Sequence, residues 1–162
     1  MILIAAGSNL PFCDIDSQEL VTRSLFSIRR FLSVVSVSSQ YFSPAWPNEA
    51  DPPFVNAAAL VETSLTPPKL LAALHAVEAA FGRVRSVKNA PRTLDLDLIA
   101  YHDLVTDGAV GEPILPHPGH ASRDFVLAPI AEIAPFWRSP TTGRSAIEML
   151  EALPARSAVK IG

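Results

Sequence analysis

The chain has 162 residues, of which 49% are hydrophobic and 18% are charged, so it is long enough for one core and too apolar for a disordered protein. Its formal net charge of −3 gives no reason to expect nucleic acid or an anionic membrane as a partner. The single cysteine, Cys13, excludes an intramolecular disulfide and suits a reducing compartment. We therefore expect one cytoplasmic domain over residues 1–162.

The chain begins with a short apolar run, Ile2–Ala6, which stops at a Gly-Ser-Asn turn. The run is too short for a signal-peptide core or a membrane-spanning helix, and it predicts a buried strand. Hydrophobic spacing, capping residues and β-branched runs predict the rest of the fold. In chain order the predicted elements are strand 2–6, helix 17–33, strand 33–42, strand 54–63, helix 67–82, strand 93–103, a small hairpin within 107–120, helix 122–135 and helix 143–154.

The order strand, helix, strand, strand, helix, strand is typical of the ferredoxin-like βαββαβ sandwich, an α+β fold. It predicts an antiparallel sheet with helices on one face, which leaves the other face and the loop rims for a ligand. Residues 43–54 hold four prolines in twelve positions, so they cannot form regular structure. Irregular loops of this length are more often functional than idle.

Two aspartates stand out in the leucine-rich strand at 93–103. Alternate residues of a strand share a face, so Asp95 and Asp97 point the same way, with Ile99 and Tyr101 expected to follow them. At about 6 Å, two such charges repel by roughly 0.7 kcal/mol in water and roughly 2.8 kcal/mol at an effective dielectric of 20. A magnesium ion between them would reverse the sign of this interaction, since Mg²⁺ prefers oxygen ligands and phosphates.

A basic cluster precedes the aspartates, with Arg83, Arg85, Lys88 and Arg92 within ten residues and no acid between them. Arginine forks bind phosphate oxygens well, so the two clusters together suit a polyanion and a cation. The alternative is a solvated strand face with Arg92 as a surface counter-charge, and spacing alone leaves both interpretations open. The sequence has no GxxxxGK[ST], GxGxxG or HExxH motif, so arginines and a metal would have to bind any phosphate.

Six motifs then occur in the order and spacing of one family: "AAGSNL", "FVNAAALVETSL", "VEAAFGRVR", "APRTLDLDLIAY", "PHP" and "RDFVLAPIAEIAP". From residue 2 to about 135 the sequence resembles the 6-hydroxymethyl-dihydropterin pyrophosphokinases of folate biosynthesis. The resemblance implies a ferredoxin-like fold. It also implies an enzyme that uses two Mg²⁺ ions, moves the pyrophosphoryl group of ATP to the hydroxymethyl oxygen of the reduced pterin and releases AMP.

The resemblance also implies roles for individual side chains. The implied metal ligands are Asp95 and Asp97, which also count as catalytic together with Arg83 and Arg92. The implied ATP contacts are His75, Glu78, Arg85, Arg92, His117 and Arg123. The implied pterin contacts are Ser43, Pro44, Trp46, Phe54, Asn56 and Phe125. From the residues alone, core packing is the favoured role of the two phenylalanines. The His75–Glu78 pair is equally compatible with a surface pair, whereas an Asn inside an apolar strand already demands buried partners.

The chain departs from the family pattern in a slightly short loop at Arg83–Arg92 and in two substitutions. Asn89-Ala90 replaces a common Trp-Gly, and Gly119 stands where a basic residue is common. His117 and His120 have a spacing that would suit zinc, although no third ligand is evident. We expect a monomer that binds magnesium-ATP first and the pterin second. The alternatives are a two-metal nucleotidyl transferase or cyclase on the same fold, and a non-catalytic ligand sensor.

Overall fold

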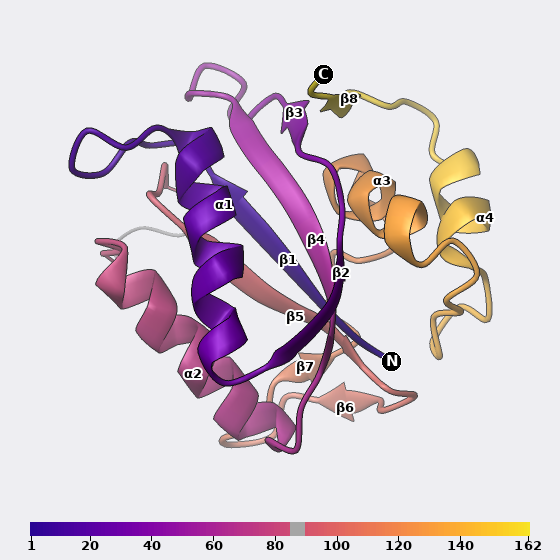
Figure 1. Cartoon of the computed structure of the whole chain (residues 1–162). Coiled ribbons are helices and arrows are strands. Elements are labelled where there is room, and N and C mark those ends of the chain that lie inside the picture. Colours follow the sequence, from indigo (N-terminus) through magenta and orange to yellow (C-terminus); the bar gives the residue numbers. More distant parts are fainter. Residues whose placement is uncertain (85–89) are drawn as a thin grey trace.

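A computed structural model describes residues 1–84 and 90–162 and shows an antiparallel sheet with helices on both sides (Figure 1). The strands of the main sheet are β1 (Ile2–Ser8), β2 (Ser33–Val37), β3 (Tyr41–Ser43), β4 (Phe54–Glu62), β5 (Asp95–Tyr101) and β8 (Val159–Lys160). Their order is β5-β1-β4-β3-β8. β2 also pairs with β4, along its second half, whereas β3 pairs with its beginning. The predicted hairpin is confirmed by β6 (Thr106–Asp107) and β7 (Ile114–Leu115), which form a separate two-stranded sheet.

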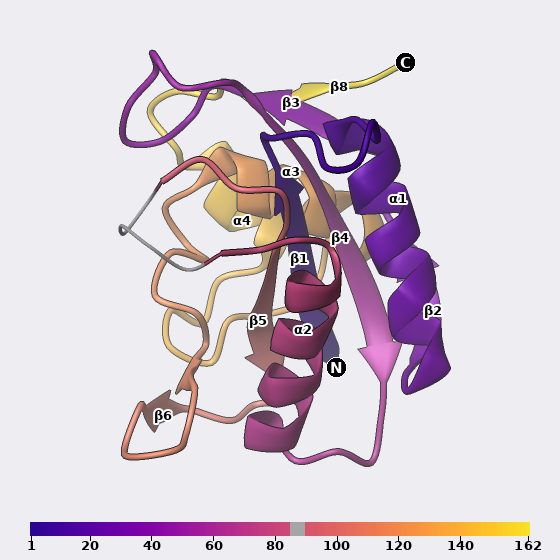
Figure 2. The same ribbon diagram turned by 90° about the vertical axis from the view of Figure 1, so that its left-hand side faces the viewer.

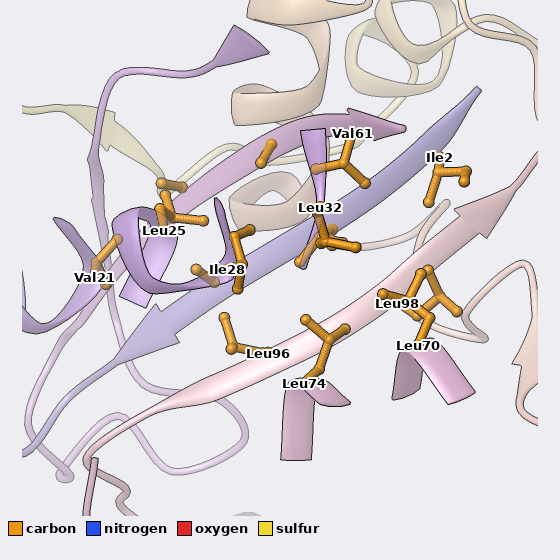
Figure 3. Packing of buried hydrophobic residues seen from close by; sticks show 14 of the residues in the cluster. Ile2, Val21, Leu25, Ile28, Leu32, Val61, Leu70, Leu74, Leu96 and Leu98 are labelled. Atoms are coloured by element: carbon orange, nitrogen blue, oxygen red, sulfur yellow. The ribbon is translucent and has the colours of Figure 1, made fainter. Parts of the chain in front are cut away.

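The first face of the sheet is covered by α1 (Ser17–Ser27), the short 3₁₀ helix η1 (Ile28–Arg30) and α2 (Pro67–Ala80). Asp16 caps α1, because its side chain accepts a hydrogen bond from the Glu19 amide. Figure 3 shows leucines of α2 pointing at leucines of β5 in the core between helix and sheet. These buried side chains form the core on this face.

The second face carries α3 (Asp124–Ile133) and α4 (Ala146–Glu151), so the prediction of helices on one face only was wrong (Figures 1 and 2). Leu3 and Ile99 of the sheet are fully buried in one cluster with Leu127 and Ile130 of α3. The reason lies in the strands themselves: nearly every residue of β1 is buried, on both faces. A strand that is apolar on both sides needs a covering layer on both sides.

The strand predicted over residues 33–42 is two strands. Residue Ser38 interrupts it, because its hydroxyl accepts a hydrogen bond from the Ala58 amide of β4. β3 then pairs with the beginning of β4, with Ser43 opposite Phe54 and Tyr41 opposite Asn56. The break therefore brings the start of the proline-rich loop to the same sheet end as Phe54.

A bulge lies between β1 and β5, where Ile4 pairs with Leu98 but Leu3 pairs with Ala100. Ile99 is the extra residue and packs on the second face as predicted. Beyond the bulge the alternation is reversed, so Tyr101 packs against the first face rather than following the aspartates as we expected.

None of the helices formed by residues 1–84 and 90–162 has both the length and the apolar character needed to span a membrane.

Candidate active site

A pocket opens on the second face of the sheet, beyond the part that α3 covers. It forms where β1 and β3 end and β4 and β5 begin, since antiparallel neighbours bring these ends together. Ten residues predicted from the sequence line it: Ser43, Pro44, Trp46, Phe54, Asn56, Arg92, Asp95, Asp97, Arg123 and Phe125. Segments more than 80 residues apart in the chain thus meet in one pocket.

One wall of the pocket is charged. The Arg92 Nε lies 2.8 Å from Asp95 Oδ2, and Arg83 Nη2 lies 3.4 Å from Asp95 Oδ1. The Arg92 Nε–H does not point at the carboxylate, so this contact is an ion pair rather than an aligned hydrogen bond. Two guanidinium groups therefore flank one carboxylate, and the neighbouring Asp97 completes an acidic edge.

Asp97 has a raised pKa, to about 6, because burial disfavours its charged form and because the charge of Asp95 repels it. The charges of His117 and Arg92 act in the opposite direction and are outweighed. Two carboxylates that share one face and repel each other fit a divalent cation, and both provide the hard oxygen ligands that Mg²⁺ prefers. In the described residues no three His, Cys, Asp or Glu side chains are grouped to hold a metal. Asp95 and Asp97 could thus hold Mg²⁺ only together with oxygens from a bound substrate or water.

A second wall of the pocket is aromatic. Arg92 lies over the Phe54 ring, with its guanidinium carbon 4.9 Å from the ring centroid. The Arg123 guanidinium lies 4.6 Å from the Trp46 centroid and 5.9 Å from that of Phe125. Both arginines therefore rest on the aromatic faces by cation–π contact. The same faces offer stacking surfaces for a flat heterocycle.

Asn56 is the polar residue at the pocket floor and is 7% exposed. Its amide nitrogen donates to the Ser43 hydroxyl at 3.0 Å. Its amide oxygen faces Gly7, where an added Cβ would lie 3.4 Å away. The Asn56–Ser43 bond fixes the amide, so its oxygen is held in position to accept a hydrogen bond from a ligand edge.

The predicted nucleotide contacts lie in different places. Arg123 lines the pocket, whereas His75 is exposed on α2 and Glu78 is only 1% exposed. A surface pair is therefore excluded for Glu78, whose carboxylate accepts a hydrogen bond from the Leu96 amide at 2.8 Å and ties α2 to the strand between the two aspartates. His117 lies close enough to Asp97 to affect its pKa. Arg85 lies outside the described residues.

The zinc site that the spacing of His117 and His120 allowed does not form. The two ring nitrogens of His120 are both engaged, Nδ1 with the His117 carbonyl at 2.7 Å and Nε2 with the Ser139 hydroxyl at 2.8 Å. His120 is 5% exposed and its ring packs edge-on against Trp137. It is a satisfied core histidine.

The sequence interpretation missed two contributors. Asn9, which the sequence suggested was only part of a turn, is 4% exposed. Its Oδ1 accepts a hydrogen bond from the Arg92 amide at 2.7 Å, and its Nδ2 donates one to the Pro52 carbonyl at 2.9 Å. It thus holds Arg92 and the proline-rich loop together. Gly119 makes room for Arg123, since a Cβ there would lie 2.7 Å from the guanidinium carbon. An Asn directly after a buried strand was the available signal for Asn9. Gly119 stood out only as a departure from the family pattern, which did not indicate its contact with Arg123.

Comparison with known proteins identifies the family of this chain. The family model for 7,8-dihydro-6-hydroxymethylpterin-pyrophosphokinase matches residues 3–135. The chain is 43% identical over 120 residues to the 2-amino-4-hydroxy-6-hydroxymethyldihydropteridine pyrophosphokinase of Synechocystis, covering 74% of this chain and 60% of that protein. It is 37% identical over 155 residues to the protein of the same name from Pseudomonas aeruginosa, covering 94% of this chain and 91% of the relative.

Among solved structures, the wild-type HPPK-DHPS of Plasmodium falciparum has a similar fold. The TM-score is 0.70 at 10% sequence identity, and the match covers 93% of this chain and 40% of that protein. This likeness concerns the fold alone, and the chain spans less than half of that larger protein. The family match and the Pseudomonas relative decide the assignment: the chain belongs to the 7,8-dihydro-6-hydroxymethylpterin-pyrophosphokinase family.

Proposed function

We propose that this chain transfers the pyrophosphoryl group of ATP to the hydroxymethyl oxygen of 6-hydroxymethyl-7,8-dihydropterin and releases AMP, a step of folate biosynthesis. The observation that carries the proposal is the pocket itself. One wall presents the carboxylates of Asp95 and Asp97 with Arg92, and the other presents Phe54 and Phe125 with Asn56. A polyphosphate suits the first wall and a flat, hydrogen-bonding ring suits the second.

In the proposed complex the pterin ring lies between Phe54 and Phe125. The Asn56 oxygen accepts a hydrogen bond from the ring edge, and the Ser43 hydroxyl keeps that amide in its orientation. Pro44 and Trp46 border the same pocket and exclude water from the ring. This arrangement directs the hydroxymethyl group toward the carboxylate wall, which is the positioning that transfer requires.

The phosphate chain is proposed to lie against Arg83, Arg92 and Arg123, with contributions from His75, Glu78, Arg85 and His117 as the family resemblance implies. Guanidinium groups stabilise the negative charge that spreads over phosphate oxygens in transfer. Asp95 and Asp97 would hold two Mg²⁺ ions, which supply positive charge to the phosphates and to the attacking hydroxyl. Glu78 contributes by fixing the strand that carries both aspartates.

We also propose that the core is ferredoxin-like and that residues 1–162 work as one domain and as a monomer. The antiparallel order β5-β1-β4-β3 supports the first point, because it corresponds to strands four, one, three and two of a βαββαβ chain. The single cysteine supports a cytoplasmic setting.

The two alternative functions are not favoured. A ligand sensor does not require a pair of repelling carboxylates in its pocket, and the charged wall is therefore unexplained by that hypothesis. A nucleotidyl transferase or cyclase does not require an aromatic slot with a fixed amide beside the metal site. The family assignment also points away from both.

One assay separates the three functions. The protein is incubated with ATP, magnesium and reduced hydroxymethylpterin, and the nucleotide product is identified by chromatography. AMP supports the pyrophosphokinase. Pyrophosphate with a nucleotidyl adduct would support the transferase, and an absence of turnover would support the sensor.

A further inference from the structure

A buried carboxylate that no step of the proposed reaction uses lies between two pocket residues. Asp124 is the first residue of α3, flanked by Arg123 and Phe125, and it is 8% exposed. Its Oδ1 accepts a hydrogen bond from the Phe125 amide at 2.8 Å. Its Oδ2 accepts from the Ser157 amide, from the Ser157 hydroxyl at 3.1 Å and from the Ala158 amide at 2.7 Å.

These contacts join segments that are far apart in the chain. Ser157 and Ala158 lead directly into β8, which pairs with β3 so that Lys160 lies opposite Tyr41 and Val159 opposite Phe42 (Figure 1). β3 ends at Ser43, the residue that orients Asn56. Asp124 therefore connects two elements that border the pterin slot, the start of α3 and the end of β3, through β8.

The chemistry of this contact needs a carboxylate. Four hydrogens converge on Asp124, and both of its oxygens act only as acceptors. An asparagine has one acceptor oxygen and two amide hydrogens, so in either orientation it would lose one side of the contact and set N–H against N–H. Burying a carboxylate without this compensation would be costly.

We propose that Asp124 is a positioning residue of the pterin slot: by clamping β8 to the start of α3, it fixes the orientation of Phe125 and Arg123. This inference rests on the proposed function, since it concerns the binding of that substrate. Asp124 itself does not line the pocket, so it acts through its neighbours. Its loss should therefore weaken pterin binding more than it slows the transfer of a bound substrate.

Glu132 provides a matched control at the other end of α3. Its carboxylate also ties the helix to β3 and β8, through the Tyr41 hydroxyl at 2.8 Å, the Ser39 hydroxyl at 2.8 Å and Lys160 Nζ at 3.2 Å. It lies seven residues beyond Phe125, about 10 Å along a helix that rises about 1.5 Å per residue. Removing its charge loosens the same strand without disturbing the pocket end of the helix.

The test compares the unmodified protein with Asp124→Asn and Glu132→Gln. Steady-state AMP formation gives kcat and the KM for the pterin, and amide hydrogen exchange of residues 123–126 and 157–160 follows the clamp. For Asp124→Asn we expect the pterin KM to rise roughly tenfold, the scale of one lost hydrogen bond to a charged group, with kcat changed less. Exchange at Phe125 should be faster. For Glu132→Gln we expect an unchanged pterin KM.

Two results would overturn the inference: a pterin KM of Asp124→Asn close to that of the unmodified protein, or an equal rise in Glu132→Gln. If Asp124→Asn does not fold, the variant Ser157→Pro tests the clamp instead, because it removes one N–H donor to Asp124 without altering α3. A raised pterin KM in this variant supports the clamp, and an unchanged pterin KM refutes it. An unmodified protein that releases no AMP would refute the proposed function instead. Amide hydrogen exchange would then test the clamp by itself. Faster exchange at Phe125 in Asp124→Asn but not in Glu132→Gln would support it, and any other result would refute it.

Discussion

The two faces of the sheet are built from the same strands, but the first face forms a hydrophobic core and the second face also forms the pocket. On the first face the helices α1 and α2 pack over the strands, and Leu96 and Leu98 are buried there (Figure 3). On the second face α3 and α4 cover only part of the sheet, and the uncovered end holds Gly7, Asp95 and Asp97. One strand thus contributes leucines to the core and aspartates to the pocket by simple alternation. Substitutions one residue apart should therefore have opposite effects on stability and activity.

The largest effect is expected on the pocket side of β5. Asp97→Ala should lower the rate of AMP formation at least about a hundredfold, the scale of a lost electrostatic stabiliser, because the acidic edge can no longer hold Mg²⁺. Its melting temperature should not fall, because the substitution removes a carboxylate that burial and Asp95 disfavour. Turnover assays and thermal melts check both points, and an unchanged rate would rule out the metal role.

The opposite result, a loss of stability with little change in kcat, is expected at Leu98, the residue after Asp97, which faces the core. Leu98 is 3% exposed in the first-face core, and Leu98→Ala should lower the free energy of unfolding by about 2–5 kcal/mol through lost burial and the cavity left behind. Denaturant unfolding measures this loss. The kcat of the folded fraction should stay near that of the unmodified protein, and a loss of kcat as large as in Asp97→Ala would show that the two faces are not separable.

A smaller effect concerns how the two walls of the pocket influence each other. Arg92 and Arg123 rest on the rings of Phe54 and Trp46, so a pterin that stacks there must displace their guanidinium groups. Bound phosphates would attract these guanidinium groups and free the rings for the pterin. We expect magnesium with a nonhydrolysable ATP analogue to tighten pterin binding about tenfold or more, within the usual range of coupling between sites. Calorimetric titration with and without the nucleotide measures this, and tight pterin binding in its absence would refute the expected order.

The smallest effect is a pH dependence away from the pocket. Burial tends to raise the pKa of Glu132, but hydrogen bonds from Tyr41 and Ser39 outweigh it and lower the pKa. The pKa of Tyr41 is raised to about 12 by burial and by Glu132, so its hydroxyl remains a donor at neutral pH. Because the folded pKa of Glu132 lies below the unfolded one, its stabilisation is present at neutral pH and is lost as pH falls below about 4.3 and through the folded pKa.

Glu132→Gln should therefore melt at a lower temperature than the unmodified protein at pH 7, with the difference shrinking on acidification. Thermal melts at several pH values measure the difference. If the gap between the two proteins stayed constant down to acidic pH, the carboxylate would not be the source of the stabilisation.

Much of the pocket could be predicted from local sequence. Period-two alternation in β5 gave the shared face of Asp95 and Asp97, and an Asn inside the apolar strand β4 indicated a buried partner, which is Ser43. These inferences succeed because they depend on a few neighbouring residues. The site roles of the ten predicted residues that line the pocket were implied by the resemblance to the family's motifs, and local patterns alone singled out only Asp95, Asp97, Arg92 and Asn56 among them.

The features that escaped prediction depend on long-range packing. The cover on the second face follows from where α3 and α4 dock, and periodicity within a helix does not say on which side of a sheet it packs. The bulge at Ile99 shifted Tyr101 to the other face, and two-residue β8 is too short to leave a pattern. Asp124 lies within the RDFVLAPIAEIAP motif, but its role depends on Ser157, which only the fold brings beside it.

The most direct test of the central claim is a crystal structure of this protein with magnesium, a nonhydrolysable ATP analogue and the pterin. We expect Mg²⁺ bound by the carboxylates of Asp95 and Asp97, with Arg92 and Arg123 moved from the aromatic rings to the phosphates. A fully occupied complex in which both aspartates have no metal ligand role would contradict the claim.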